Sequence, residues 1–173
     1  MVHDKGQERV LALDLRSGRA GFVVLEGLDK LLDWGVRSYT PRYGPLEVTV
    51  SRRIASLLGL HQPSVMVLRL PSNRLVKKND RIRVIVRTLR KEAKRRSVSL
   101  RLLRRQRIKK IFSAQGRATK HQIASLMAER FSDLAWKLPP KRKLWQSENY
   151  HMTVFDAAAA GVAHFWRPDA QKP

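Results

Sequence analysis

The sequence contains no cysteine, few aromatic residues (7%) and only 14 acidic residues. Without cysteine the chain cannot form a disulfide scaffold, a thiolate nucleophile or a cysteine-ligated zinc site. It also lacks a long apolar run, because the longest one, residues 153–165, is interrupted by Asp156 and is too short to span a bilayer. Residues 1–9 carry no apolar signal segment. We therefore expect a cytoplasmic protein with no membrane partner.

The chain has 36 basic residues against its 14 acidic ones, which gives a formal net charge of +22 at pH 7. A charge of this size destabilises a compact domain by self-repulsion unless a partner offsets it. Residues 74–110 contain 17 basic residues and only two acidic ones, Asp80 and Glu92. A surface that needs only to be soluble would carry a mixture of positive and negative side chains. Nucleic acid has the matching charge density and is the expected partner. An anionic membrane face or a basic assembly segment is the alternative.

The chain is long enough for one domain with a real core, since it has 173 residues of which 43% are hydrophobic. We place this domain at residues 9–166, with an N-terminal tail at 1–8 and a C-terminal tail at 167–173. Apolar runs predict buried strands, and apolar residues three and four positions apart predict helices. The expected strands are 9–14, 21–26, 31–39, 64–70 and 97–103, and the expected helices are 46–60, 75–94, 104–112, 119–131 and 147–166. Apart from the short basic helix at 104–112, the order is β-β-β-α-β-α-β-α-α, which predicts an α/β fold, a mixed sheet with helices packed on both faces.

Three features of this order carry a resemblance to a known family. Asp14 ends the first strand, and Asp156 precedes a run of small residues at 157–163 (AAAAGVA). Residues 105–122 (RQRIKKIFSAQGRATKHQ) form a basic helix that leads through a glycine turn into a helix with a Thr–Gln capping box. Together these features resemble the RuvC family of Holliday-junction resolvases, in the RNase H-like superfamily, over about residues 9–165.

The resemblance implies a metal-dependent, structure-selective endonuclease, a hydrolase that resolves Holliday junctions in DNA recombination and repair. This chemistry needs carboxylates around two metal ions roughly 3.5–4 Å apart. Carboxylate oxygens suit Mg²⁺, with Mn²⁺ as a substitute. By the resemblance Asp14 and Asp156 are catalytic metal ligands, and Glu148 is the nearest candidate for a third catalytic acid. A family-like active unit would be a homodimer that makes one cut per subunit.

Two positions depart from the family pattern. At the end of the fourth strand, where the family has a second carboxylate, the sequence has Arg69, which would repel a metal ion or hold a phosphate. About one turn before the last family acid it has Met152 and Thr153. On one continuous helix Glu148 would lie about 12 Å from Asp156 along the axis, so it can join the site only from a position before the helix. A catalytically lapsed RuvC-like module that binds DNA or structured RNA is therefore the second interpretation.

Basic side chains on the predicted helices and turns are the expected contacts to nucleic-acid backbones. Arg117 and Lys120 flank the N-terminus of the capped helix, where backbone N–H groups can bind a phosphate, although an ordinary glycine turn is the alternative. Trp136 and Trp145 flank the loop at 138–143 and would either stack on unpaired bases or pack in the core. The full set of expected nucleic-acid-binding residues is Arg69, Arg83, Arg87, Arg90, Arg104, Arg105, Arg107, Lys109, Lys110, Arg117 and Lys120.

Overall fold

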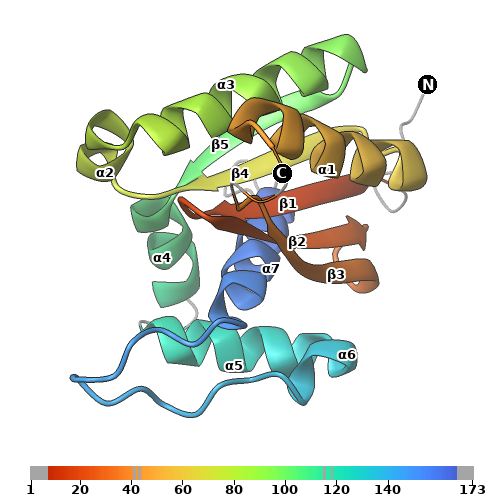
Figure 1. Cartoon of the computed structure of the whole chain (residues 1–173). Helices are drawn as coiled ribbons and strands as arrows, with labels where there is room; N and C mark the ends of the chain where they lie inside the picture. The colour runs from red at the N-terminus through yellow and green to blue at the C-terminus, as the bar shows by residue number, and fades with distance from the viewer. Residues whose placement is uncertain (1–7, 41, 43, 115, 118, 167–173) are drawn as a thin grey trace.

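The computed structural model describes residues 8–40, 42, 44–114, 116–117 and 119–166, except the side chains of Asn73 and Leu75. The expected C-terminal tail and all but the last residue of the expected N-terminal tail lie outside this part. Five strands form one mixed sheet in the order β3-β2-β1-β4-β5 (Figure 1). They are β1 (Arg9–Leu15), β2 (Arg19–Glu26), β3 (Lys30–Ser38), β4 (Val65–Leu70) and β5 (Ser99–Arg104).

The first three strands form an antiparallel meander, with β2 between β1 and β3. β4 then pairs with β1 in parallel, and β5 pairs with β4 in parallel. Because β1 and β4 run in the same direction, their carboxyl ends meet at one edge of the sheet. The register there places Asp14 opposite Arg69.

Helices cover both faces of the sheet, as predicted (Figure 1). Along β1, Leu11 and Leu13 point toward the helices of one face, while Val10 and Ala12 point toward those of the other. The first face carries α1 (Leu46–His61) and α3 (Asp80–Arg95), with α2 (Asn73–Lys78) preceding α3. The second carries α4 (Arg105–Ser113), α5 (Lys120–Arg130), α6 (Ser132–Ala135) and α7 (Met152–Phe165). Among the helices described, none has the length and apolar character needed to cross a membrane.

Small residues let α7 lie very close to the sheet. A Cβ on Gly21 of β2 would fall 2.3 Å from the carbonyl oxygen of Thr153, and one on Gly161 would fall 2.8 Å from Leu25 Cδ1. The backbone N–H of Gly21 also donates a hydrogen bond to the Thr153 hydroxyl (3.0 Å). This close approach fixes the first turns of α7, and with them Asp156, above the end of β1.

The last helix begins later than the sequence predicts. We expected it from Ser147, but it begins at Met152, after a segment without regular structure. The reason is tertiary, since Glu148 is drawn to basic groups on other elements instead of continuing the helix. The expected helix over 75–94 is also divided, because the side chain of Asn79 caps α3 by accepting from the N–H of Ile82 (3.2 Å).

Candidate nucleic-acid interface

A buried ion pair lies at the sheet edge where β1 and β4 end. Asp14 is completely buried, and the guanidinium of Arg69 lies 2.5 Å from its Oδ1. The same guanidinium lies 3.6 Å from Oδ2 of Asp156 on α7. Thr153, also on α7, donates its hydroxyl to Asp14 Oδ2 (2.9 Å). Burial of a lone carboxylate is costly, and these partners offset the cost of burying Asp14.

Arg16 links all three acids that the sequence singled out. Its Nε lies 3.0 Å from Asp14 Oδ2, and one terminal nitrogen lies 3.0 Å from Asp156 Oδ2 and 3.2 Å from Glu148 Oε2. The Tyr39 hydroxyl donates to the Arg16 carbonyl (2.9 Å) and so fixes this turn. Sequence reasoning did not identify Arg16 as a site residue. A basic residue two positions after a strand-end acid was the available signal.

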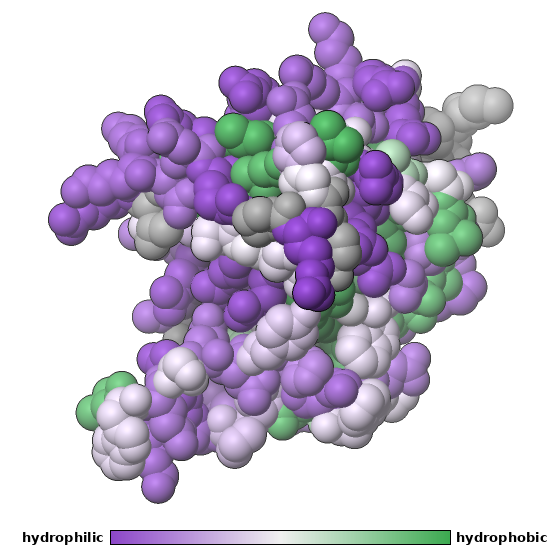
Figure 2. Space-filling view, in the orientation of Figure 1, coloured by the Kyte–Doolittle hydropathy of each residue, from purple (hydrophilic) through white to green (hydrophobic). Residues whose placement is uncertain are grey.

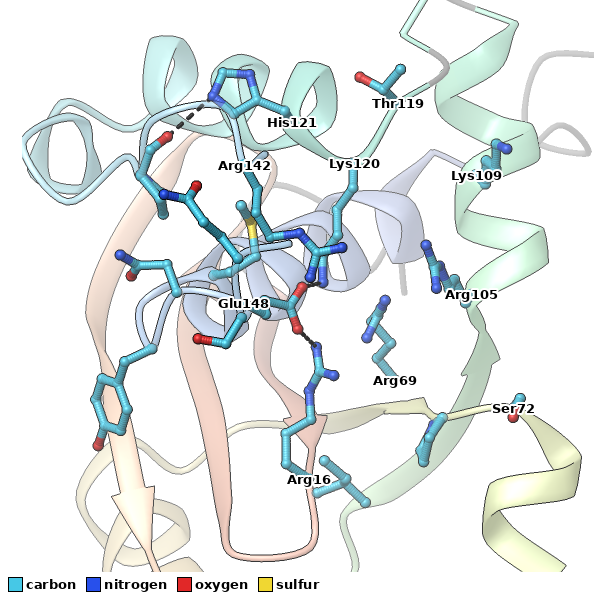
Figure 3. A pocket seen from close by; sticks show the side chains of 18 of the residues that line it. Arg16, Arg69, Ser72, Arg105, Lys109, Thr119, Lys120, His121, Arg142 and Glu148 are labelled. Carbon is cyan, nitrogen blue, oxygen red and sulfur yellow. Dashed lines mark hydrogen bonds and ion pairs between the residues drawn. The ribbon is translucent and has the colours of Figure 1, made fainter. Parts of the chain in front are cut away.

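Lys120 completes the cluster from the start of α5. Its Nζ lies 2.8 Å from Asp156 Oδ2 and is bonded to Oε1 of Glu148, and Figure 3 shows Glu148 between Lys120 and Arg16. The predicted capping box is present: the Thr119 hydroxyl accepts from the N–H of Gln122, whose side chain accepts from the N–H of Thr119. This cap sets the first turn of α5 and thereby the position of Lys120.

The electrostatics of the cluster differ between its basic groups. Burial alone would lower the pKa of Arg16, but Asp14 and Asp156 together hold this pKa above its ordinary value. For Lys120, burial lowers the pKa despite the attraction of Asp156, and repulsion from Arg16 and Arg69 adds to the decrease. The cluster therefore holds the proton of Arg16 firmly, whereas Lys120 gives up its proton more readily than an ordinary lysine.

The donor set does not fit the two-metal centre that the resemblance implies. Asp14, Glu148 and Asp156 are gathered at one place, but each is paired with at least two basic groups. Arg69 lies between Asp14 and Asp156, where its charge opposes that of a divalent cation. Over the described ranges, no group of three His, Cys, Asp or Glu residues could hold a metal ion. The expected Mg²⁺ or Mn²⁺ ligand roles are therefore not supported by this arrangement.

A large basic cleft opens beside the ion-pair cluster. Its volume is about 1470 Å³, and Figure 3 shows Arg16, Arg69, Arg105, Lys109 and Arg142 around it. The cleft brings together five of the predicted nucleic-acid-binding residues: Arg69, Arg104, Arg105, Lys109 and Lys120. Sequence reasoning missed three further basic residues that line it: Arg16, Lys141 and Arg142.

The other predicted nucleic-acid-binding residues do not line this cleft. Three of them are exposed on α3, which covers the opposite face of the sheet: Arg83, Arg87 and Arg90. Arg107 and Lys110 are exposed on α4, and Arg117 lies 3.6 Å from Glu129. Their contact with nucleic acid stays a prediction.

The tryptophans differ in whether they pack in the core or are exposed, where they could stack on bases. Trp166 is partly buried and packs against the core, with its ring centroid 5.3 Å from that of Phe112. Trp136 and Trp145 are 71% and 80% exposed, so core packing is wrong for both side chains. Trp136 lies edge-on to Trp34, with ring centroids 6.3 Å apart.

Comparison with known proteins places this fold. No family model and no curated protein matches the chain. Among solved structures, it is similar to Thermus thermophilus RuvC in complex with a Holliday-junction substrate, with a TM-score of 0.66 and 15% identity over 90% of this chain and 92% of that one. It is also similar to Ydc2, the yeast mitochondrial Holliday-junction resolvase (TM-score 0.51, 14% identity, 92% and 79% of the two chains). The fowlpox virus resolvase in complex with Holliday-junction DNA matches with a TM-score of 0.53 and 11% identity, over 92% of this chain and 99% of that one.

The chain therefore has the fold of the RuvC-like resolvases, an RNase H-like mixed sheet, as its sequence predicts. The yeast and fowlpox proteins are described as resolvases, and the Thermus and fowlpox structures are complexes with a Holliday junction.

Proposed function

We propose that this chain binds branched DNA through the basic cleft and does so without a metal ion. The observation that carries the proposal is the position of Arg69, 2.5 Å from Asp14 and 3.6 Å from Asp156. The guanidinium there, together with that of Arg16, offsets the charge of the two carboxylates without a divalent cation. The site then stops repelling phosphate while holding no metal ion for hydrolysis.

Basic residues elsewhere in the cleft supply the electrostatic attraction for DNA phosphates. Inside the cluster, three acids are matched by Arg16, Arg69 and Lys120. Beyond it, five basic residues of the cleft make no ion pair with any acid of the described chain: Arg104, Arg105, Lys109, Lys141 and Arg142. A concave surface with unmatched positive charge concentrates nucleic-acid phosphates. That Holliday-junction resolvases share the fold supports a branched duplex as the ligand.

The test is the binding of a four-way DNA junction in EDTA and in Mg²⁺, over a range of salt concentrations. We expect salt-dependent binding that does not need Mg²⁺. Replacement of Arg104 and Arg105 by Ala should weaken binding and reduce the slope of log K against log salt by up to about 2, because each phosphate contact contributes about 0.9. Replacement of Arg52 on α1 and Lys94 on α3 by Ala removes the same charge from exposed positions outside the cleft and outside the predicted binding set, and serves as the matched control.

Two results would overturn this proposal. One is a strict requirement for a divalent cation in junction binding. The other is an equal loss of affinity in the cleft variant and in the control variant, which would show that net charge alone, and not the cleft, drives binding.

A metal-dependent nuclease is the second candidate, because Asp14, Glu148 and Asp156 all contact Arg16 and so lie around one point. The test is cleavage of the same junction with Mg²⁺ or Mn²⁺, beside the Asp14→Asn variant. Tight binding without cleavage supports the metal-independent proposal. Paired nicks that are lost in Asp14→Asn would establish the nuclease instead. The homodimer expected for two-fold cutting stays a prediction, and sedimentation of the protein–junction complex measures it.

A further inference from the structure

An exposed apolar tip lies at the rim of the cleft, on the segment between α6 and α7. Leu144 is 98% exposed and Trp145 is 80% exposed. In Figure 1 this segment, drawn in blue, extends beyond α5 and away from the body of the protein, and Figure 2 shows apolar surface at the same extremity. Exposed large apolar side chains that project together usually mark a contact surface.

Both ends of this segment are held by the first residues of α5. The carbonyl of Pro139 lies 3.1 Å from Nε2 of His121. Nine residues further on, Glu148 is bonded to Lys120 and lies 3.2 Å from Arg16. The segment is therefore a loop anchored at its base on the ion-pair cluster, so its position relative to the cleft is set by the site itself.

The tip is a tight turn that presents two side chains outward. The N–H of Gln146 donates to the carbonyl of Lys143 (3.1 Å), and the N–H of Lys143 donates to the side-chain oxygen of Gln146 (3.1 Å). Leu144 and Trp145 are the two central residues of this turn. The ammonium of Lys143 lies 5.5 Å from the Trp145 ring centroid. An ordered turn loses little conformational entropy when these side chains bind a partner.

We propose that Trp145 stacks on a base exposed at the branch point of the DNA held in the cleft, and that Leu144 packs beside it. Charge selects this partner, because Lys141, Arg142 and Lys143 precede the tip and the first two line the cleft. Nucleic acid is the ligand that offers phosphates to those cations and aromatic faces to the tip. A duplex keeps its bases stacked, so the tip distinguishes a branch from linear DNA. This inference rests on the proposed binding of branched DNA.

The experiment compares Trp145→Ala and Leu144→Ala with the unaltered protein on a junction that carries 2-aminopurine at the branch point. The unaltered protein should raise 2-aminopurine fluorescence, because the base leaves its neighbours. Trp145→Ala should abolish this rise and weaken junction binding roughly five- to hundred-fold. Binding to a linear duplex of equal length should change less than two-fold. Trp136→Ala is the matched control, since Trp136 is similarly exposed but precedes the residues of this segment that line the cleft, which begin at Pro139.

The outcomes separate this inference from the proposed function. Junction binding by the unaltered protein, with no fluorescence change and no effect of Trp145→Ala, overturns the stacking role and leaves the cleft proposal in place. No junction binding by the unaltered protein overturns both. A blue shift of Trp145 emission on anionic vesicles, absent with the junction, would assign the tip to a lipid surface and also overturn the inference.

Discussion

The guanidinium of Arg69 lies 2.5 Å from the carboxylate of Asp14, its register partner on the neighbouring parallel strand. Both side chains are buried, with 6% of Arg69 and none of Asp14 exposed to solvent. Thr153 on α7 donates to the same carboxylate, so the pair also joins the sheet to the last helix. The pair therefore combines a structural role with control over the charge of the cleft.

Removal of Arg69 should destabilise the fold. Arg69→Met removes the guanidinium next to the buried carboxylate of Asp14. Breaking a buried ion pair in this way lowers the free energy of unfolding by about 3–5 kcal/mol. Because Arg16 still reaches Asp14, we expect the lower end of this range. Urea unfolding of the two proteins measures this loss of unfolding free energy. The double variant Arg69→Met with Asp14→Asn should recover part of the loss, whereas strictly additive effects would show that the two side chains are not coupled.

Enlargement of Gly21 should push α7 away from the sheet. A Cβ at this position meets the backbone of Thr153 at 2.3 Å, which cannot rotate aside as a side chain could. We expect Gly21→Ala to cost about 1–3 kcal/mol of unfolding free energy. Gly18→Ala is the matched control, because a Cβ there has no atom within 4 Å. Equal stability of the two variants would contradict the close packing of α7 on β2.

Loss of the α5 cap should affect both stability and binding. Thr119→Ala removes the acceptor for the N–H of Gln122 and should cost about 1 kcal/mol by thermal unfolding. It should also weaken junction binding, because Lys120 in the first turn then loses its fixed position in the cleft. Thr119→Ser keeps the hydroxyl and should restore both properties. A binding defect that Ser does not restore would mean that the cap does not position Lys120.

The lowered pKa of Lys120 predicts a pH dependence of stability. The folded protein releases this proton at lower pH than the unfolded chain, whose lysine has an ordinary pKa. Between these two pKa values the unfolded state binds more protons, so stability rises with pH. The unfolding free energy of the unaltered protein should therefore increase relative to Lys120→Met as pH rises toward the ordinary lysine range. If the difference in unfolding free energy between the two proteins stays constant from pH 7 to pH 10, the prediction is wrong.

Local patterns account for most of the fold. Four-residue apolar runs predict β1, β2 and β4 because a buried strand must be apolar on both faces. The Thr119–Gln122 capping box predicts the start of α5 because it satisfies its own hydrogen bonds. The start of α7 could not be predicted in the same way. Residues 147–151 are compatible with helix, and only the attraction of Glu148 to Lys120 and Arg16, far away in sequence, removes them from it.

By itself the sequence determined the mixed sheet, the small-residue helix that packs on it, the acids Asp14 and Asp156 and the excess of positive charge. These follow from side-chain periodicity, size and charge, which act locally or add over the chain. Only the tertiary structure decided which basic side chains contact these acids. The parallel register of β1 and β4 brings Arg69 onto Asp14, and the turn after β1 brings Arg16 onto Asp14, Glu148 and Asp156. Charge pairing depends on distances of a few ångströms between residues far apart in sequence, and those distances exist only once the sheet and its helices have packed.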